Sequence, residues 1–172
     1  MRIIKTVLLC AITGSLLSII GCGGNSPDST ALTRIESPGA EKKEEQIKTY
    51  YVNEDVTELI QMKTTVHYDK ETDKYLAALN ALKKSPKESL YSLCPNTTFL
   101  SAQLESRQLT IDLHLPEVDR MGASGEGLLL EALSKALFQF NEVDTFEVLV
   151  DGGEVDSLMG HYDLPSPFVR QE

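Results

Sequence analysis

One continuous stretch, from Leu128 to Arg170, constrains the fold of this 172-residue chain more than any other. Its first part places apolar residues at the three- and four-residue spacing of one helix face, namely Leu129, Leu133, Ala136, Leu137 and Phe140. Asn141 is the predicted left-handed end of that helix. The next residues alternate with the two-residue period of a strand, with Phe146, Val148 and Val150 on one face and Glu147 and Leu149 on the other.

The residues after this strand predict a tight turn and an extended tail. The run Asp151–Gly153 supplies the positive φ angles of a two-residue hairpin turn. Gly160 permits a sharp bend. Pro165 and Pro167 stiffen the end of the chain and remove two backbone donors, so we expect that end to lack a full ladder of hydrogen bonds.

Upstream of this stretch, the sequence predicts two strands and a helix. Residues 47–53 and 59–68 are rich in β-branched and aromatic residues, which favours strands. Residues 55–62 also fit a short helix, and the pattern leaves that alternative open. Thr72 is the predicted N-cap of the following helix and Pro86 its end, with one apolar face made by Tyr75, Leu76, Leu79 and Leu82.

A second hairpin is predicted between the two helices, with strands over residues 97–105 and 108–115 and a turn at Ser106-Arg107. Simple alternation in its first strand places Phe99 and Ser101 on one face and Leu100, Ala102 and Leu104 on the other. Its second strand has one apolar face, made by Leu109, Ile111, Leu113 and Leu115. A loop over residues 116–125 is expected to follow, with Ser124 capping the last helix.

These elements predict an α+β fold with the order β-β-α-β-β-α-β and a short extra strand after the Asp-Gly turn. Each helix has one apolar stripe and the second hairpin has one apolar face, so the economical arrangement is a small mixed sheet with two helices packed on one face. Residues 47–172 are enough for one such domain, and no internal repeat is visible.

The C-terminal stretch resembles the GerMN domain, a module of sporulation and germination lipoproteins. The resemblance rests on Val150-Asp151-Gly152, on Leu158-Met159-Gly160-His161 and on the ending with Pro167 and Arg170; Ile111-Asp112-Leu113 is similar to the family's Val-Asp-Leu step. One detail departs from the family, because Ala136-Leu137 replaces the usual Thr-Leu pair before the aromatic residue Phe138. An unrelated α+β domain that reuses a common hairpin is the alternative.

The resemblance implies a structural motif and an assembly role. The motif residues are Asp112, Asp151, Gly152, Gly160, His161, Pro167 and Arg170. Within it, we expect the His161 ring to fix the tail by donating a hydrogen bond to the backbone, and Arg170 to lock the tail against the sheet. The GerMN fold resembles the ring-building modules of secretion machines, and family members support channels between the two cells of a sporangium or take part in germination.

The N-terminus predicts secretion and lipid anchoring. Residues 1–21 have a short basic start and then a long apolar run without an acidic residue, as a signal peptide has. The run ends in Gly21-Cys22, which resembles the lipobox of bacterial lipoproteins, in which the Cys sulfur receives a diacylglyceryl group and acyl chains such as palmitate follow. An uncleaved membrane anchor is the alternative. Residues 22–46 carry this Cys and a linker too polar to fold, with a reach of roughly 25–30 Å.

Charge and cysteine content exclude several function classes. The formal net charge is −10, and from Glu105 onward the chain has 4 basic and 14 acidic residues, so nucleic-acid binding is not expected. Beyond Cys22 the processed chain has one further cysteine, Cys94, which excludes an internal disulfide. Its apolar neighbours favour a buried, inert thiol over a reactive one.

No motif predicts catalysis, a cofactor or a metal. His67, His114 and His161 are far apart in the sequence, and the Gly-rich run 122–127 lacks the Lys of a phosphate loop, which favours a flexible loop. A polar cluster near the C-terminus offers oxygen ligands for a hard cation, namely Glu154, Asp156, His161 and Asp163. A solvated turn is the competing interpretation of that cluster.

We therefore expect a non-enzymatic, lipid-anchored extracytoplasmic module that needs no cofactor. Its expected partners are the membrane, through lipid on Cys22, and an envelope protein or a second copy of itself, with sporulation or germination as the process. The alternative is a lipoprotein that binds a small ligand or a divalent cation. A hydrolase of cell-wall components is a third hypothesis, for which the sequence nominates no residue.

Overall fold

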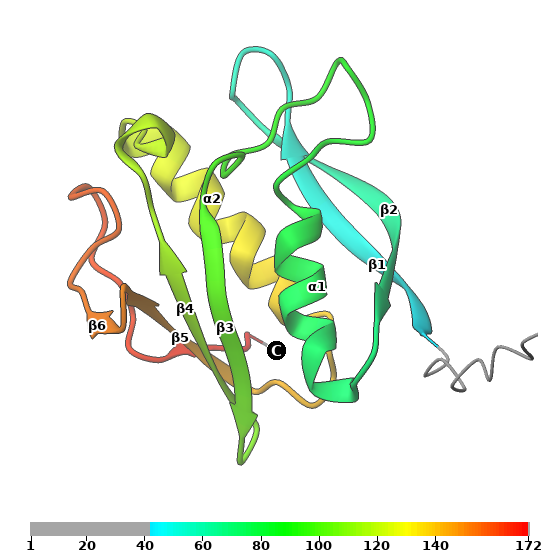
Figure 1. Cartoon of the computed structure of the whole chain (residues 1–172). Coiled ribbons are helices and arrows are strands. Elements are labelled where there is room, and N and C mark those ends of the chain that lie inside the picture. The colour runs from blue at the N-terminus through cyan, green and yellow to red at the C-terminus, as the bar shows by residue number, and fades with distance from the viewer. Residues whose placement is uncertain (1–41, 172) are drawn as a thin grey trace, which may run out of the picture. The chain divides into compact units, whose positions relative to one another are not determined.

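Two hairpins and two helices provide most of the regular structure in residues 42–171, the part of the chain that the computed structural model describes (Figure 1). The elements are β1 (Lys43–Val52), β2 (Leu59–Tyr68), α1 (Lys74–Ala81), β3 (Thr98–Glu105), β4 (Gln108–His114), α2 (Ala123–Leu137), β5 (Thr145–Val150), β6 (Gly153–Glu154) and β7 (Phe168–Val169), with 3-10 turns at Glu71–Asp73 and Glu117–Asp119. Among these residues, none of the helices has both the length and the apolar character needed to cross a bilayer.

The predicted fold class, α+β with two helices and a mixed sheet, is confirmed. β3 and β4 form an antiparallel pair, β4 and β5 run parallel, and β6 and β7 both pair antiparallel with β5. One feature differs from the expected single sheet, because β1 and β2 form a two-stranded sheet of their own. The parallel step from β4 to β5 is made through α2, as a crossover connection requires.

The helices link the β1–β2 hairpin to the larger sheet. α1 contacts β2, β3 and α2, and α2 also contacts β1 (Figure 1). The apolar stripe predicted for the last helix is buried in full, as is the apolar face of β4. On the inner face of β5, Phe146 and Val148 are buried and Val150 is half-buried. Both helices lie on this inner side of the larger sheet (Figure 1). We call the opposite side of β3, β4 and β5, which no helix covers, the open face; its side chains on β4 and β5, such as Thr110 and Glu147, are half-buried.

The strand and turn predictions are mostly confirmed. β2 has the predicted bounds, so the alternative of a short helix over residues 55–62 is wrong, while β1 begins at Lys43, four residues before the predicted start. The turn at Ser106-Arg107 has φ angles of 47° and 70°, and Asp151-Gly152 has 52° and 78°. These are the left-handed angles that a two-residue hairpin turn requires.

A bulge in β3 overturns the predicted alternation. The register of β3 against β4 shifts between Phe99 and Ser101, so the extra residue Leu100 has no partner and is 48% exposed. Phe99 therefore lies on the same inner face as Ala102 and Leu104, which pack against the core. A bulge of one residue reverses the sense of every later side chain, which simple alternation cannot foresee.

The predicted helix caps are wrong. α2 begins at Ala123 with Gly122 as N-cap, so Ser124 lies inside the helix and residues 123–127 are not a loop. Thr72 lies in a 3-10 turn before α1, and α1 ends at Ala81 rather than near Pro86. Tyr51 explains the early end, because its hydroxyl donates to the carbonyls of Ala81 (2.7 Å) and Lys84 (3.1 Å).

The predicted left-handed end of α2 at Asn141 is also wrong. Among described non-glycine residues, positive φ angles occur only at Val56, Ser106, Arg107 and Asp151. α2 ends at Leu137, and the carbonyl groups that follow it are taken by arginine side chains. The Asn141 carbonyl, for example, accepts a hydrogen bond from Arg107 Nη2 at 2.8 Å.

Candidate functional site

The turn after β5 is fixed by a carboxylate on the neighbouring strand. The backbone N–H of Gly152 donates to Asp112 Oδ1 at 2.9 Å, and that of Asp151 donates to the Leu113 carbonyl at 3.0 Å. The Asp151 carboxylate lies 2.9 Å from His114 Nδ1. Three motif residues named from the sequence, Asp112, Asp151 and Gly152, are therefore together, and they set the direction in which the chain leaves the sheet.

The next loop is held by Glu126, a fully buried carboxylate in the first turns of α2. It accepts hydrogen bonds from the Ser157 hydroxyl (2.9 Å), the Met159 N–H (2.9 Å) and the His161 N–H (3.0 Å). Burial alone would raise the pKa of Glu126, but these hydrogen bonds outweigh it and lower the pKa. The carboxylate is thus an ionised anchor for the loop, a role that sequence reasoning missed.

The role expected for His161 has to be corrected. Its backbone N–H, not its ring, makes the hydrogen bond to Glu126 that fixes the loop, and the side chain is exposed. Gly160, with a φ angle of 94°, provides the expected bend, and its N–H donates to Ser157 Oγ at 2.7 Å. The bend is therefore held by backbone N–H groups that donate to the side chains of Ser157 and Glu126.

Arg170 holds the end of the chain. Its guanidinium donates to the carbonyls of Phe138, Phe140 (2.7 Å) and Val143, the groups that follow α2, and it lies 5.3 Å from the centre of the Phe138 ring. The Arg170 guanidinium therefore binds main-chain carbonyl oxygens and not a surface carboxylate. Just after Pro167, Phe168 stacks on Phe146 with ring centres 4.4 Å apart.

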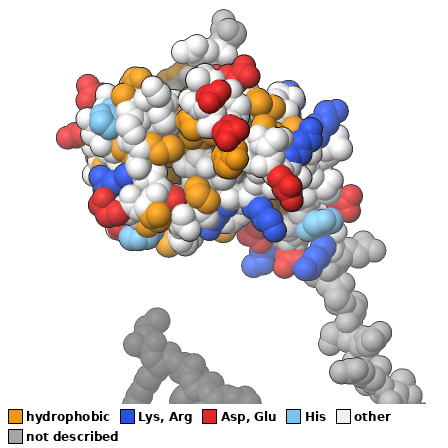
Figure 2. Space-filling view, turned by 90° about the horizontal axis from the view of Figure 1, so that it is seen from above, with side chains coloured by type: hydrophobic (Ala, Val, Ile, Leu, Met, Phe, Trp, Pro, Cys, Tyr) orange, Lys and Arg blue, Asp and Glu red, His pale blue; other side chains and the backbone are white. Residues whose placement is uncertain are grey.

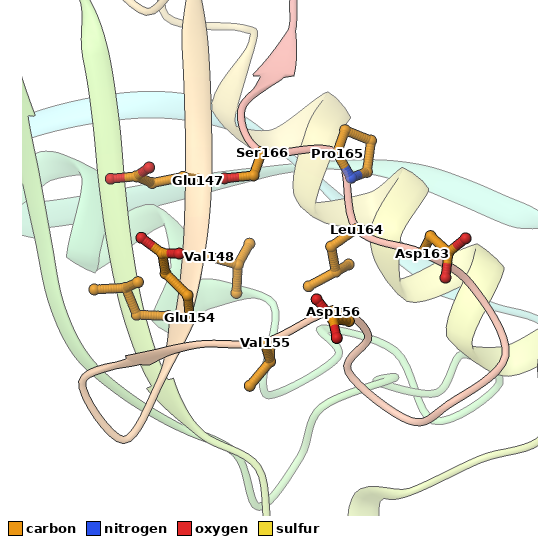
Figure 3. A pocket seen from close by; sticks show the side chains of 10 residues that line it. Glu147, Val148, Glu154, Val155, Asp156, Asp163, Leu164, Pro165 and Ser166 are labelled. Carbon is orange, nitrogen blue, oxygen red and sulfur yellow. The ribbon is translucent and has the colours of Figure 1, made fainter.

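Together these contacts frame a pocket of about 470 Å³ beside β5 (Figure 3). Its walls are β5, residues 154–156 at and after the end of β6, and residues 163–166. The N–H of Leu164 donates to the Asp156 carbonyl at 2.8 Å, which closes the loop between the last two of these walls. We call it the acidic pocket, because four carboxylates and no basic side chain line it, namely Glu147, Glu154, Asp156 and Asp163.

The carboxylates of the acidic pocket have no cationic partner within residues 42–171. The ion pairs of the described residues are all made by other acidic side chains. Glu147 accepts a hydrogen bond from Thr110 Oγ1 at 2.7 Å. Three of the four residues proposed for a cation site, Glu154, Asp156 and Asp163, line this pocket, and His161 does not.

The acidic pocket is not arranged as a metal centre. Within residues 42–171, no three His, Cys, Asp or Glu side chains converge so that they could hold an ion. His67 lies 3.8 Å from Glu44 at the start of β1, and His114 pairs with Asp151, so the three histidines remain apart. Cys22 and the signal and linker segments lie outside the described residues, and the calls made on them stay predictions.

Cys94 is a structural thiol, as its apolar sequence context predicted. It is 1% exposed, and burial raises the pKa of its thiol to about 12. The hydroxyl of Ser92 lies 3.9 Å from its sulfur, and no ring nitrogen of a described histidine contacts it. The thiolate needed for nucleophilic chemistry is therefore scarce at neutral pH.

The open face of the sheet extends from the acidic pocket across β4 and β3. A second hollow of about 440 Å³ lies on this face, lined by Gln103, Glu105, Ser106, Gln108, Thr110 and Glu147. Glu147 lines both hollows. Figure 2 shows another side of the molecule, seen from above the view of Figure 1, and there apolar side chains lie among charged and polar ones.

Comparison with known proteins gives a family match over most of the described body. A family model described as Germane, sporulation and spore germination, matches residues 48–156. Asp112, Asp151 and Gly152 lie within this range, whereas Gly160, His161, Pro167 and Arg170 lie beyond it. No curated protein matches the chain at a significant level.

Solved structures show the same fold at low sequence identity. A candidate lipoprotein from Clostridium perfringens is similar with a TM-score of 0.51 and 22% identity, over 75% of this chain and 88% of that one. The first GerMN domain of the sporulation protein GerM from Bacillus subtilis has a TM-score of 0.58 and 15% identity, over 74% of this chain and 98% of that one. The tandem GerMN domains of GerM give 0.52 and 20%, over 79% of this chain and 50% of theirs.

Proposed function

Because this chain belongs to the Germane family of sporulation and spore germination, we propose that it is a lipid-anchored, extracytoplasmic protein-interaction module. In this proposal it supports the assembly or stability of a cell-envelope complex during sporulation or germination. Cys22, at the end of the signal sequence, carries the lipid, and the linker lets the folded body reach a partner above the membrane.

One observation carries the interaction role: the larger sheet is covered by helices on one face only, and its open face ends in the acidic pocket. The buried carboxylates elsewhere are already occupied by the chain's own groups. Glu126 binds the 157–161 loop, and Asp119 accepts hydrogen bonds from Asn96 and Thr97. These groups stabilise backbone structure, so we assign the module no catalytic step.

The anchor is tested by metabolic labelling with palmitate in the native host. We expect the wild-type protein to incorporate label and to sediment with membranes, and the Cys22→Ser variant to do neither. If that variant incorporated label equally, Cys22 would not be the lipidated residue.

The interaction is tested by chemical crosslinking in intact cells, followed by mass spectrometry of the captured bands. We expect a reproducible adduct with another envelope protein or with a second copy of this chain. The adduct should persist when cytoplasmic contents are removed before capture. Recovery of monomer alone, at crosslinker levels that join known neighbours in the same membrane, would contradict the proposal.

The alternative, a lipoprotein that binds a small cationic ligand, is favoured by one observation, the size of the acidic pocket. Its volume of about 470 Å³ falls within the range of roughly 300–1,000 Å³ that is usual for small-molecule sites. Calorimetry with calcium, magnesium and spermidine distinguishes the two functions. Saturable binding of one of these with micromolar affinity would favour the alternative.

A further inference from the structure

The hairpin of β1 and β2 has one closed edge and one free edge. On the edge of β1, the Gln139 side chain accepts a hydrogen bond from the Lys48 N–H at 2.7 Å and donates to the Lys48 carbonyl at 3.0 Å. Further along this edge, Val52 and Tyr91 exchange two main-chain hydrogen bonds, of 2.9 and 2.8 Å. β2 pairs with no strand other than β1 among the described residues, so its outer edge has no neighbouring strand.

The two contacts on β1 fix the direction of the main chain in β2. They show that the polar groups of Lys48 and Val52 point away from β2. Their partners in the ladder are Lys63 and Leu59, so these are its non-hydrogen-bonded pairs, in which both residues direct their N–H and carbonyl groups outward. Because alternate residues behave alike, β2 presents outward main-chain groups at Leu59, Gln61, Lys63, Thr65 and His67.

These outward groups are available for pairing. Within residues 42–171, none of them makes a hydrogen bond to another main-chain group, and the hydrogen bonds of Gln61 and Thr64 use side-chain atoms. The side chains of alternate residues from Gln61 to His67 are exposed, so the edge is accessible from solvent. A row of unpaired N–H and carbonyl groups is a template for a further strand.

The apolar side of this edge is also incomplete. Ile60 and Met62 lie on the same face of β2 as the buried Val66, since alternate residues of a strand share a face. Both are only half-buried, and neither belongs to the half-buried apolar residues that pack against the core. A strand added beside β2 would place every second side chain next to them. The edge therefore suits a segment in which apolar and polar residues alternate.

Lys63 determines the charge of that segment. Lys48 and Lys63 lie directly opposite each other and both are exposed. The ion pairs found within the described part of the chain use neither of them. Like charges in this position repel, and a carboxylate on an added strand would offset the repulsion. A second copy of β2 would bring two further lysines to the same face, so charge favours an acidic partner strand over self-pairing.

The acidic end of the hairpin limits the length of the segment. Glu44 lies opposite His67, and Asp69 and Glu71 follow β2 in the chain. These carboxylates repel an acidic segment, so we expect pairing over Leu59–Thr65 only, a length of about 23 Å.

We propose that the free edge of β2 binds an extended acidic segment of a partner protein, which adds an antiparallel strand over Leu59–Thr65 and places a carboxylate beside Lys63. This inference rests on the proposed interaction function and names the partner chemistry for one surface. A lysine in the middle of a free edge discourages pairing with neutral or basic strands. Lys63 therefore both limits aggregation and selects the acidic partner.

The test is amide hydrogen exchange, measured by NMR on the full lipidated protein in detergent micelles. The probe is a capped seven-residue peptide of alternating valine and threonine with glutamate at its centre. We expect it to slow exchange at Gln61, Lys63 and Thr65 by at least about fivefold when most of the protein is bound. Met62 and Thr64 already direct their N–H groups to β1 and should change by less than about twofold. Charge attraction without strand pairing would not produce this alternation.

Matched peptides and variants locate the contact. With the central glutamate replaced by glutamine or lysine, the peptide should bind about threefold and at least about tenfold more weakly, respectively. The variant Lys63→Glu should reverse this preference and bind the lysine peptide more tightly. The control Lys70→Glu changes an exposed lysine beyond the end of β2 and should alter affinity by less than about twofold.

Three outcomes would overturn the inference: equal binding of the lysine peptide, an equal effect of Lys70→Glu, or no slowing of exchange at about 5 mM glutamate peptide. Slowing of the same amides with rising protein concentration and no peptide would assign the edge to a second copy, and would overturn it as well. If crosslinking in cells succeeds while the peptide fails, the interaction function stands and this docking surface is wrong. If both fail, the function falls too.

Discussion

Several single side chains hold backbone segments that are distant from them in the sequence. These contacts are the part of the structure that the sequence predicted least. Glu126 binds groups 31 to 35 residues away, and Gln139 binds the N–H and carbonyl of Lys48, 91 residues away. No local pattern marks such pairs. Arg170 was selected through the resemblance to a family, whereas the ring of His161 was given a role that its backbone performs.

Replacing Glu126 with Gln should lower the free energy of unfolding by about 2–3 kcal/mol at pH 7, because three donors lose a charged acceptor. The pKa of Glu126 is lowered in the folded state, so its stabilising effect is present above the unfolded value of about 4.5 and is lost as pH falls through the lower folded value. Urea unfolding should therefore show wild type and variant converging below about pH 4. A difference that stays constant with pH would contradict this role.

Replacing Arg170 with Lys should cost about 1–2 kcal/mol in the same assay, since an ammonium cannot reach three carbonyls at once. The control is Arg120→Lys, at an exposed arginine that pairs with Glu117, where the loss should stay below about 0.5 kcal/mol. Equal losses at the two positions would mean that the carbonyl contacts contribute little.

The sequence predicted the type of most helices, strands and turns correctly, and it predicted the ends of the helices less well. Strand periodicity located β2, β4 and β5, and the glycine and aspartate turns were placed correctly. The helix caps failed because tertiary contacts decide them: Tyr51 ends α1, and a buried carboxylate lies in the first turns of α2. The bulge at Leu100 could not be predicted from the sequence, because the residues around it are compatible with a regular strand.

The start of α2 gives a prediction at this scale. Alanine at Gly125 would gain about 1 kcal/mol of helix propensity, but its Cβ would lie 2.6 Å from the Cβ of Met121. We expect a net loss of about 1–3 kcal/mol, measured by thermal unfolding. Gly122→Ala is the control, because nothing lies within 4 Å of the new Cβ, and it should cost less than about 1 kcal/mol. A stabilised Gly125→Ala variant would show that Met121 moves away freely.

For the whole molecule, the order of elements was enough to predict the fold class, and the family resemblance is confirmed by the family match, so the alternative of an unrelated domain is wrong. The division into two sheets was not foreseen. It depends on α1, which contacts both β2 and β3, and on Gln139, which occupies the edge of β1 at Lys48. The acidic pocket was also unpredictable as a pocket, because it exists only where β6 and β7 leave a gap along β5.

The most direct measurement is photocrosslinking in living cells from a residue on the rim of the acidic pocket. A photoreactive amino acid is placed at Ser166, which lines the pocket, and in a matched strain at Asp69, which is exposed elsewhere. The account predicts a discrete adduct with an envelope protein from position 166 and none from position 69, with the adduct lost when Glu154, Asp156 and Asp163 are neutralised. Equal adducts from both positions, or none from position 166, would contradict it.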